Sequence, residues 1–351
     1  MAALPMPAAA VVVNATPSPI AYSIIVPLFD CRDAGTRALE SALDQAFARD
    51  RYEVIAVVDA TARSQWPNEL LARCDRVVAV AADFAAVESE IALFDAGARR
   101  ACGDYVYFIE GHTVLAPRAL AAIDAALAAN PACVLACGRR TNHSTTRLGS
   151  LVGANNDVHE DRARAQGGFT LGANCVIRRS AFVSLGGFDA KFQRFNESVL
   201  FQRVRDARMP LVAIDATLCT HHNDAGFLWL VRLLVATGHA KSRYYKSLHD
   251  AGLPPRPRHP VYRWLGSAPA AAVAVVPLRI AGPLLILISM SLAWVLPRVA
   301  AKIYRAGVGF TDVSGFCAER AFGERRAVVP ARSGASSVTS AQARSLRKAR
   351  G

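Results

Sequence analysis

The sequence lacks cysteines at the spacing of a metal centre, a redox motif or a disulfide framework. Its 8 cysteines are scattered, and the closest pair is Cys133 and Cys137. No CxxC or Cys/His zinc pattern occurs, so we expect reduced, structural thiols. The N-terminal residues also lack the lysine or arginine that precedes the apolar segment of a secretory signal. We therefore interpret residues 1–20 as a disordered leader.

Net charge is almost absent from residues 1–250, which contain 26 basic and 25 acidic residues. The formal charge of +13 comes mostly from residues 251–351, where 15 basic and 3 acidic residues surround a very apolar stretch. Basic flanks around apolar sequence favour an anionic membrane surface as a partner. A nucleic-acid partner is disfavoured because the nearly neutral first 250 residues offer no excess of positive charge.

Disorder of the whole chain is excluded because 52% of its residues are hydrophobic. Short apolar runs rich in β-branched residues alternate with segments of helical spacing, which predicts an α/β fold with a mostly parallel sheet flanked by helices. The expected strands are residues 22–27, 52–58, 76–81, 105–109 and 132–137. The expected helices are residues 33–47, 70–74, 87–100 and 117–129. We assign residues 21–250 to this domain.

Acidic residues follow three of the expected strands directly. They are Asp30, Asp59 and Glu110. Ligands bind beyond the carboxyl ends of the strands in such sheets, so these carboxylates predict a ligand site at that edge. Each of them taken alone is also consistent with the N-cap of a helix.

The periodic pattern is lost over residues 141–166, where Gly, Asn, His, Arg and Asp dominate. A long loop over the site is expected there. Order returns beyond it, with a helix over 197–208, a strand over 211–214 and a long helix over 227–248.

Two apolar runs, residues 268–278 and 280–296, are separated by Arg279. Prolines and a glycine surround this arginine and predict a bend. Basic residues on both outer flanks place both ends on the cytoplasmic side by the positive-inside rule. We expect a membrane-associated helical hairpin over residues 251–310, followed by a basic flexible tail over 311–351. The alternative is a helical hairpin buried in a soluble protein.

Further motifs occur in an order typical of one family. They are Ser23-Ile-Ile-Val-Pro27, Glu53-Val-Ile-Ala-Val-Val-Asp59, Gly103 to His112, Gly186-Gly-Phe-Asp189 and Asn196-Glu197-Ser198 with Arg203. This order resembles a family 2 glycosyltransferase of the GT-A fold, over residues 23–222. The resemblance implies a nucleotide-sugar donor bound at the strand ends. The implied nucleotide-binding residues are Pro27, Phe29, Asp30, Asp59 and Glu110, although the ring of Phe29 is as consistent with core packing.

The family's metal-binding motif corresponds to Glu110-Gly-His112 in this sequence. Two potential ligands two residues apart after a strand can reach one ion, and His221 or His222 supplies a third. An oxygen and a nitrogen ligand suit Mn²⁺ better than Mg²⁺, and both remain candidates as cofactor. The alternative is that Glu110 caps the turn and His112 is a solvated loop residue.

The family's acceptor side corresponds to Gly187, Asp189 and Asn196, with Asp189 also suited to holding the turn. Its catalytic aspartate corresponds to Ser198, and Ala60 replaces a second carboxylate beside Asp59. Glu197 is then the carboxylate left to take the proton of the acceptor hydroxyl. The alternative for Glu197 is a helix-start carboxylate favoured by the helix dipole.

The expected function is that of an inverting glycosyltransferase of the bacterial cell envelope. It would act on a lipid-linked or membrane-proximal acceptor, such as a lipid or glycan, at the cytoplasmic face of the inner membrane. The replaced carboxylates keep a second hypothesis open, in which the chain is a non-catalytic partner in a polysaccharide or glycolipid assembly complex.

Overall fold

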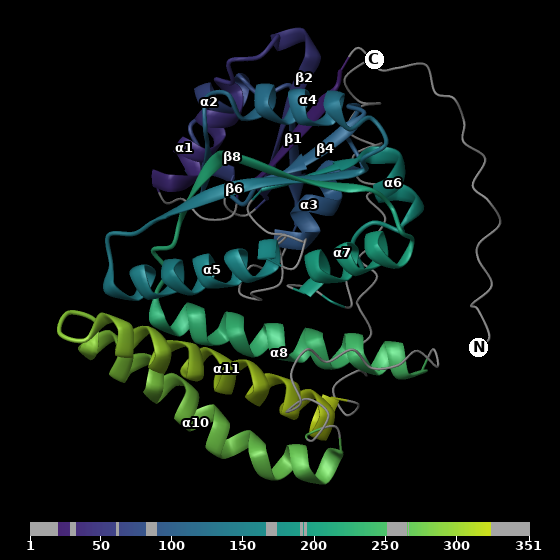
Figure 1. The fold of residues 1–351 in the computed structure, drawn as a ribbon. Coiled ribbons are helices and arrows are strands. Elements are labelled where there is room, and N and C mark those ends of the chain that lie inside the picture. Colours follow the sequence, from purple (N-terminus) through teal and green to yellow (C-terminus); the bar gives the residue numbers. More distant parts are fainter. Residues whose placement is uncertain are drawn as a thin grey trace, which may run out of the picture.

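The computed structural model describes residues 20–28, 33–60, 63–81, 90–165, 174–189, 192, 195–250, 265 and 267–323. One mixed sheet with helices on both faces forms the upper part of the molecule in Figure 1, and three long helices are stacked below it. We call residues 20–222 the sheet domain, as far as they are described. This architecture confirms the expected α/β class.

The sheet has eight strands in the order β3-β2-β1-β4-β7-β6-β8-β5. Strands β3, β2, β1 and β4 are parallel, β7 is antiparallel to both of its neighbours, β6 and β8 are parallel, and β5 is antiparallel to β8. The strands span Tyr22–Leu28 (β1), Tyr52–Asp59 (β2), Arg76–Val80 (β3), Tyr105–Phe108 (β4), Thr113–Leu115 (β5), Leu135–His143 (β6), Cys175–Arg178 (β7) and Leu211–His222 (β8).

Helices cover both faces of the sheet. In the sheet domain they span Asp33–Leu43 (α1), Asn68–Ala72 (α2), Glu90–Ala98 (α3), Ala119–Ala129 (α4), Arg147–Ala165 (α5), Arg179–Ser184 (α6) and Asn196–Asp206 (α7), with short 3₁₀ turns at Arg49–Arg51 (η1) and Arg63–Gln65 (η2). The C-terminal helices, as we call them, span Phe227–Asp250 (α8), Ala268–Leu292 (α10) and Pro297–Phe322 (α11).

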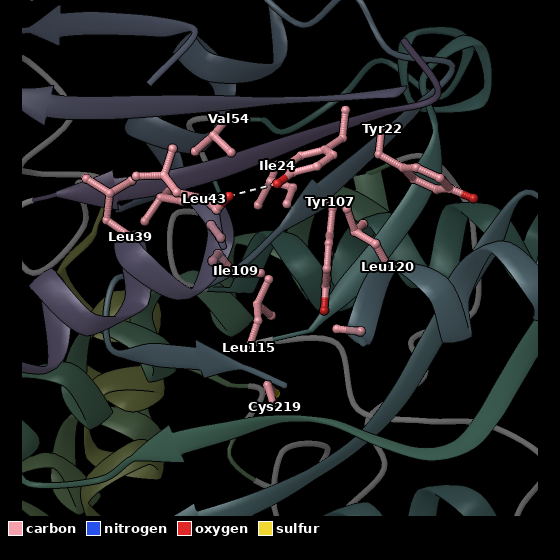
Figure 2. Close-up of a cluster of buried hydrophobic side chains, with 14 of the residues drawn as sticks. Tyr22, Ile24, Leu39, Leu43, Val54, Tyr107, Ile109, Leu115, Leu120 and Cys219 are labelled. Atoms are coloured by element: carbon pink, nitrogen blue, oxygen red, sulfur yellow. Dashed lines mark hydrogen bonds between the residues drawn. The ribbon is translucent and has the colours of Figure 1, made fainter. Parts of the chain in front are cut away.

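Two apolar cores lie on opposite faces of the sheet because successive strand residues point to opposite sides. On β1, Ile24 belongs to the core beneath α1 and α4, whereas Ile25 belongs to the core beneath α3, α6 and α7. Figure 2 shows the first of these cores, in which Leu39 and Leu120 pack onto strand residues. The hydroxyl of the buried Tyr52 donates to the Leu43 carbonyl at 2.7 Å, so its polar end is satisfied inside this core.

Residues 141–166 do not form the long loop expected from their composition. Strand β6 continues to His143, and residues 147–165 form helix α5. Asp224, far away in sequence, accepts hydrogen bonds from the backbone N–H groups of Thr145 and Thr146 at 3.0 and 3.1 Å and so satisfies donors at the start of α5. The polar sequence of the helix hid it, and the contact with Asp224 sets its start. Strand β8 likewise continues to His222, well beyond the expected end at residue 214.

The helical hairpin differs from the expected one in its two arms. Helix α10 runs without interruption through Arg279, and the second arm is α11 rather than the second apolar run. Helix α11 also includes residues 311–322, so the flexible tail expected from residue 311 was wrong over that segment. We call α10 and α11 the helical hairpin.

The C-terminal helices pack closely through small residues and ion pairs. A side chain added at Gly238 of α8 would collide with the Asp312 carbonyl of α11. Beside this contact, the Lys241 ammonium donates to Asp312 at 2.6 Å, and the Arg243 guanidinium donates to Glu319 at 2.9 Å. Charged groups therefore lie inside the helix bundle.

One helix among the described residues, over Pro269–Leu292, is long and apolar enough to cross a membrane by length and composition. Its mean hydropathy is 2.2, and 17% of its most apolar window is buried within the protein.

Candidate active site

The turn between β4 and β5 carries the Glu110-Gly-His112 motif. The Thr113 N–H donates to the Glu110 carbonyl at 2.9 Å, so the chain reverses tightly within the motif. Strand β5 pairs with β8 so that Thr113 lies opposite His221, and the His222 N–H donates to the His112 carbonyl at 3.2 Å. This register brings the end of β8 alongside the motif.

Glu110, His112 and His221 converge with their ligand atoms within 4.8 Å of one another. His221 Nε2 lies 2.7 Å from Glu110 Oε2 and 2.9 Å from His112 Nε2, and the third distance, from His112 Nε2 to Glu110 Oε2, is 3.4 Å. All three side chains are largely buried, with 10–13% exposure. The expected grouping of Glu110, His112 and His221 is therefore present.

These residues fit a divalent cation. A carboxylate oxygen and two imidazole nitrogens are ordinary ligands of Mn²⁺ and later transition metals. In its neutral form each group can direct a lone pair to a shared point, and such close acceptors require a proton or a cation between them. The arrangement favours the metal interpretation over that of a solvated His112.

His222, the alternative third ligand, points elsewhere. Its ring packs edge-on against His143, with ring centroids 4.9 Å apart. Burial lowers the pKa of His222, and the neighbouring positive charge of Arg37 adds to this effect. The structure thus selects His221 from the two histidines that the sequence left open.

Asp59 lies at the same edge of the sheet as Glu110. Ile25 of β1 is the register partner of both Ile55 on β2 and Phe108 on β4, so β2 and β4 end at similar heights on either side of β1. Two strand spacings separate Asp59 from Glu110 laterally, which is about 10 Å. The Asp59 side chain is 4% exposed, and Pro27 lies on β1, between the two strands. Phe29 and Asp30 lie outside the described residues.

The Gly186-Gly-Phe-Asp189 segment forms a tight turn held from helix α7. Gly186 and Gly187 have φ values of 82° and 61°, which L side chains rarely adopt. The Arg203 guanidinium donates to the Leu185 and Gly187 carbonyls at 3.1 and 3.0 Å. The buried Asn196 accepts from the Asp189 N–H and donates to the Asp189 carbonyl, at 2.7 and 2.6 Å. These contacts explain the motif structurally, and the acceptor role of Gly187, Asp189 and Asn196 stays a prediction.

Glu197 is a half-buried residue in the first turn of α7, and the neighbouring Ser198 is exposed. Burial raises the pKa of the Cys175 thiol, and the charges of Cys137 and Glu197 raise it further. Cys175 is the register partner of Phe108, two residues before Glu110. Glu197 therefore lies towards the edge that carries the metal-binding candidates, and its role as a base stays a prediction.

Three polar residues behind His221 were missed by the sequence interpretation: Asn142, Asp157 and Asn223. His221 Nδ1 lies 2.8 Å from Asn223 Oδ1, and the other two continue a chain of hydrogen bonds from there. Asn142 and Asp157 fell within the stretch interpreted as a loop, so only the position of Asn223, two residues after a candidate ligand, offered a signal.

Residues 23–186 match the family model of glycosyl transferase family 2. The chain carries a family 2 glycosyltransferase domain. This confirms the resemblance inferred from the motifs, and it supports the prediction of an enzyme that transfers a glycosyl group. A search of the curated proteins found no match.

Solved structures with a similar fold extend over most of the chain. The mannosyltransferase PcManGT from Pyrobaculum calidifontis, in complex with GDP-Man and Mn²⁺, is 18% identical with a TM-score of 0.54, covering 89% of this chain and 90% of that chain. TarS 1–349 from S. aureus, in complex with UDP, is 11% identical with a TM-score of 0.45, covering 87% of this chain and 92% of that one. The likeness to the mannosyltransferase supports the GT-A-like fold.

Proposed function

We propose that the chain is a metal-dependent, inverting glycosyltransferase that moves a sugar from a nucleotide-sugar donor to a membrane-proximal or lipid-linked acceptor. The observation that carries this proposal is the convergence of Glu110, His112 and His221 at the strand edge of a family 2 domain. We place the enzyme at the cytoplasmic face of the inner membrane, in bacterial cell-envelope glycan synthesis.

The donor would lie along the edge of the sheet. Asp59 binds the base or ribose at one end, and the diphosphate reaches the Glu110 turn about 10 Å away, two strand spacings along the sheet. Glu110, His112 and His221 hold a divalent cation there. Such a cation supplies positive charge that stabilises the diphosphate as a leaving group. The similar mannosyltransferase was solved with GDP-Man and Mn²⁺, which supports this choice of donor class and metal.

Glu197 acts as the base in this proposal. Inversion requires a carboxylate that takes the proton of the acceptor hydroxyl while that oxygen attacks the anomeric carbon from the side opposite the diphosphate. Glu197 lies in the first turn of α7, where the helix dipole favours its ionised form. An ionised carboxylate is the state in which it can accept a proton.

The acceptor is proposed to lie in or at a membrane because of the outward face of the helical hairpin. Val273, Val276 and Ile280 of α10 are 79%, 63% and 63% exposed, and Trp294 and Val295 at the following turn are 74% and 78% exposed. Contiguous apolar surface of this kind marks an interaction site. Basic residues flank the apolar stretch, which suits contact with anionic lipid.

One observation favours the non-catalytic alternative. Ala60 and Ser198 stand where the resembled family carries carboxylates, and Ser198 is exposed with no acid of its own. A chain that had lost catalysis could keep the nucleotide site as a structural feature of an assembly complex.

Calorimetry of the full chain in detergent, with UDP and GDP in the presence and absence of Mn²⁺, tests the proposal. We expect one of the nucleotides to bind, with an affinity that rises when Mn²⁺ is added and that loses this rise in Glu110→Gln. Lack of binding to either nucleotide would contradict the nucleotide-sugar proposal. Metal-dependent binding with no transfer from any sugar of that nucleotide would support the non-catalytic alternative.

A further inference from the structure

The second ring nitrogen of His221 is held by a buried chain of polar side chains. Nδ1 lies 2.8 Å from Oδ1 of Asn223, which is 4% exposed. Asn223 Nδ2 donates to Asn142 Oδ1 at 2.9 Å, and Asn142 Nδ2 donates to Asp157 Oδ1 at 2.5 Å. The chain therefore links helix α5, strand β6 and the segment after β8 to the metal-binding candidate.

The polarity of this chain follows from its last member. An ionised carboxylate only accepts hydrogen bonds, so Asn142 must turn its NH₂ group towards Asp157. Its amide oxygen then faces Asn223, which must direct its own NH₂ group there. Asn223 Nδ2 also donates to the His221 carbonyl at 3.3 Å, which fixes the same orientation independently.

The consequence reaches the His221 ring. Asn223 Oδ1 is an acceptor that also receives a hydrogen bond from Asn156 Nδ2 at 3.1 Å, so the proton of a neutral His221 belongs on Nδ1. Nε2 is then left with a free lone pair, and it is the atom 2.7 Å from Glu110 Oε2. The orientation of two amides thus decides which nitrogen is available to a cation.

We propose that Asp157, Asn142 and Asn223 form a positioning relay that fixes the tautomer and ring orientation of His221, so that Nε2 can ligate a divalent cation. The inference rests on the proposed metal-dependent function and extends it to residues that touch neither cation nor donor. Ligating histidines commonly depend on such a partner at the second nitrogen.

Helix α5 is shaped to deliver Asp157 to this relay. A Cβ atom added at Gly153, one turn before Asp157, would lie 3.0 Å from Asn142 Cβ and 3.3 Å from Asn223 Nδ2. The helix therefore approaches the two asparagines as closely as a residue without a side chain allows. Asp224, next to Asn223, accepts hydrogen bonds from Thr145 and Thr146 at the start of α5 and ties the helix to the same segment.

Titration of the full chain in detergent with Mn²⁺ alone, followed by the electron paramagnetic resonance signal of free Mn²⁺, tests the relay without reference to activity. Asn223→Leu removes the partner of Nδ1 and should weaken Mn²⁺ binding about 10–100-fold, the usual effect of losing such a partner. Asp157→Asn, at the exposed end of the chain, should weaken it less, because its amide no longer imposes one orientation on Asn142. Asp157→Glu keeps an acceptor and should retain the affinity of the unmutated chain.

Two controls separate the relay from general effects on folding. Asp161→Asn changes an exposed carboxylate one turn further along α5 and should leave Mn²⁺ binding unchanged. In the double variant Asp157→Asn/Asn223→Leu, the two losses should not add, because Asp157 acts through Asn223. A chain destabilised at two unrelated places would show additive losses.

The outcomes distinguish failure of the relay from failure of the proposed function. If the unmutated chain binds Mn²⁺ and Glu110→Gln abolishes binding, while Asp157→Asn and Asn223→Leu bind normally, the relay is overturned and the metal site stands. Additive losses, or equal losses in Asp157→Glu and Asp157→Asn, also overturn the relay. If the unmutated chain does not bind Mn²⁺ at all, the metal-dependent function fails and the relay fails with it.

Discussion

The sheet domain and the helical hairpin distribute polar and apolar groups in opposite ways. In the sheet domain, apolar side chains fill both faces of the sheet and the polar groups gather at one edge, around Glu110 and His221. Among the described residues, all but three of the large hydrophobic side chains that are exposed lie between Val273 and Phe322, apart from Leu228, Val158 and Val183 counted as the three. The hairpin instead buries Thr311, Asp312 and Ser314.

This difference indicates two different solvents. A domain surrounded by water gains free energy by burying apolar area, and it leaves polar groups outside or pairs them. A helix that exposes valine, isoleucine and leucine along one face gains nothing from water on that face. Helix α10 lies on the far side of α11 and α8 from the sheet in Figure 1, so its apolar face points away from the site. The comparison assigns chemistry to the edge of the sheet and attachment to the hairpin.

The largest effect expected from a single change lies at the edge of the sheet. Glu197→Gln should lower the rate of glycosyl transfer by about two to four orders of magnitude, because the amide cannot take up the proton of the acceptor. Nucleotide affinity and membrane attachment should stay unchanged. Single-turnover transfer with the sugar form of the bound nucleotide measures the rate, and Ser198→Ala is the matched control with a mild effect. Transfer at the unmutated rate would show that Glu197 is only a helix-start carboxylate.

The next largest effect concerns the apolar face of the hairpin. Ile280→Asp places a carboxylate where an exposed isoleucine lies and should weaken membrane partitioning by about 3–4 kcal/mol if that position enters the hydrocarbon region. Cosedimentation of the full chain with vesicles containing anionic lipid measures this. Ser247→Asp, on the exposed part of α8, serves as the control and should partition as the unmutated chain does. Equal partitioning of both variants would remove the hairpin from the membrane contact.

A smaller effect is expected from the far end of the proposed donor site. Asp59→Ala should weaken binding of the nucleoside diphosphate by about 1–3 kcal/mol, the cost of losing a hydrogen bond to a charged, buried group. Calorimetry measures it, with Asp50→Ala, an exposed acid before β2, as the control. Unchanged affinity would move the nucleotide away from the β2 end and separate the metal site from the donor.

The smallest effect is one of stability and depends on pH. Burial alone would raise the pKa of Asp224, but hydrogen bonds from Ser144, Thr145 and Thr146 hold it well below its usual range. Asp224→Ala should therefore lower the free energy of unfolding by about 1 kcal/mol at pH 7, as loss of a helix cap does. A depressed pKa stabilises the fold fully above the unfolded value near 4 and loses this effect as the pH falls below it. Urea unfolding at pH 7 and pH 3 should show the difference shrinking at pH 3, with Asp161→Ala unaffected at both.

Much of the sheet domain could be predicted because its strands are short apolar runs. Tyr22–Leu28 and Tyr52–Asp59 agree with the expected strands within a residue or two, since a fully buried strand needs no partner to be recognised in sequence. The polar edge was also visible, because Glu110 directly follows such a run. Helix α5 was not, because its polar residues contact other polar residues of the chain rather than an apolar core.

The sequence by itself determined the α/β class, the Glu110-Gly-His112 motif and the separation of a nearly neutral domain from a basic, apolar C-terminal part. These follow from local composition and period, which need no knowledge of distant contacts. Only the tertiary structure chose His221 over His222, because the register of β5 against β8 decides which of two adjacent side chains faces Glu110. It also joined Asp157 to His221 through Asn142 and Asn223, since hydrogen bonds between residues 15 to 81 positions apart leave no period in the sequence.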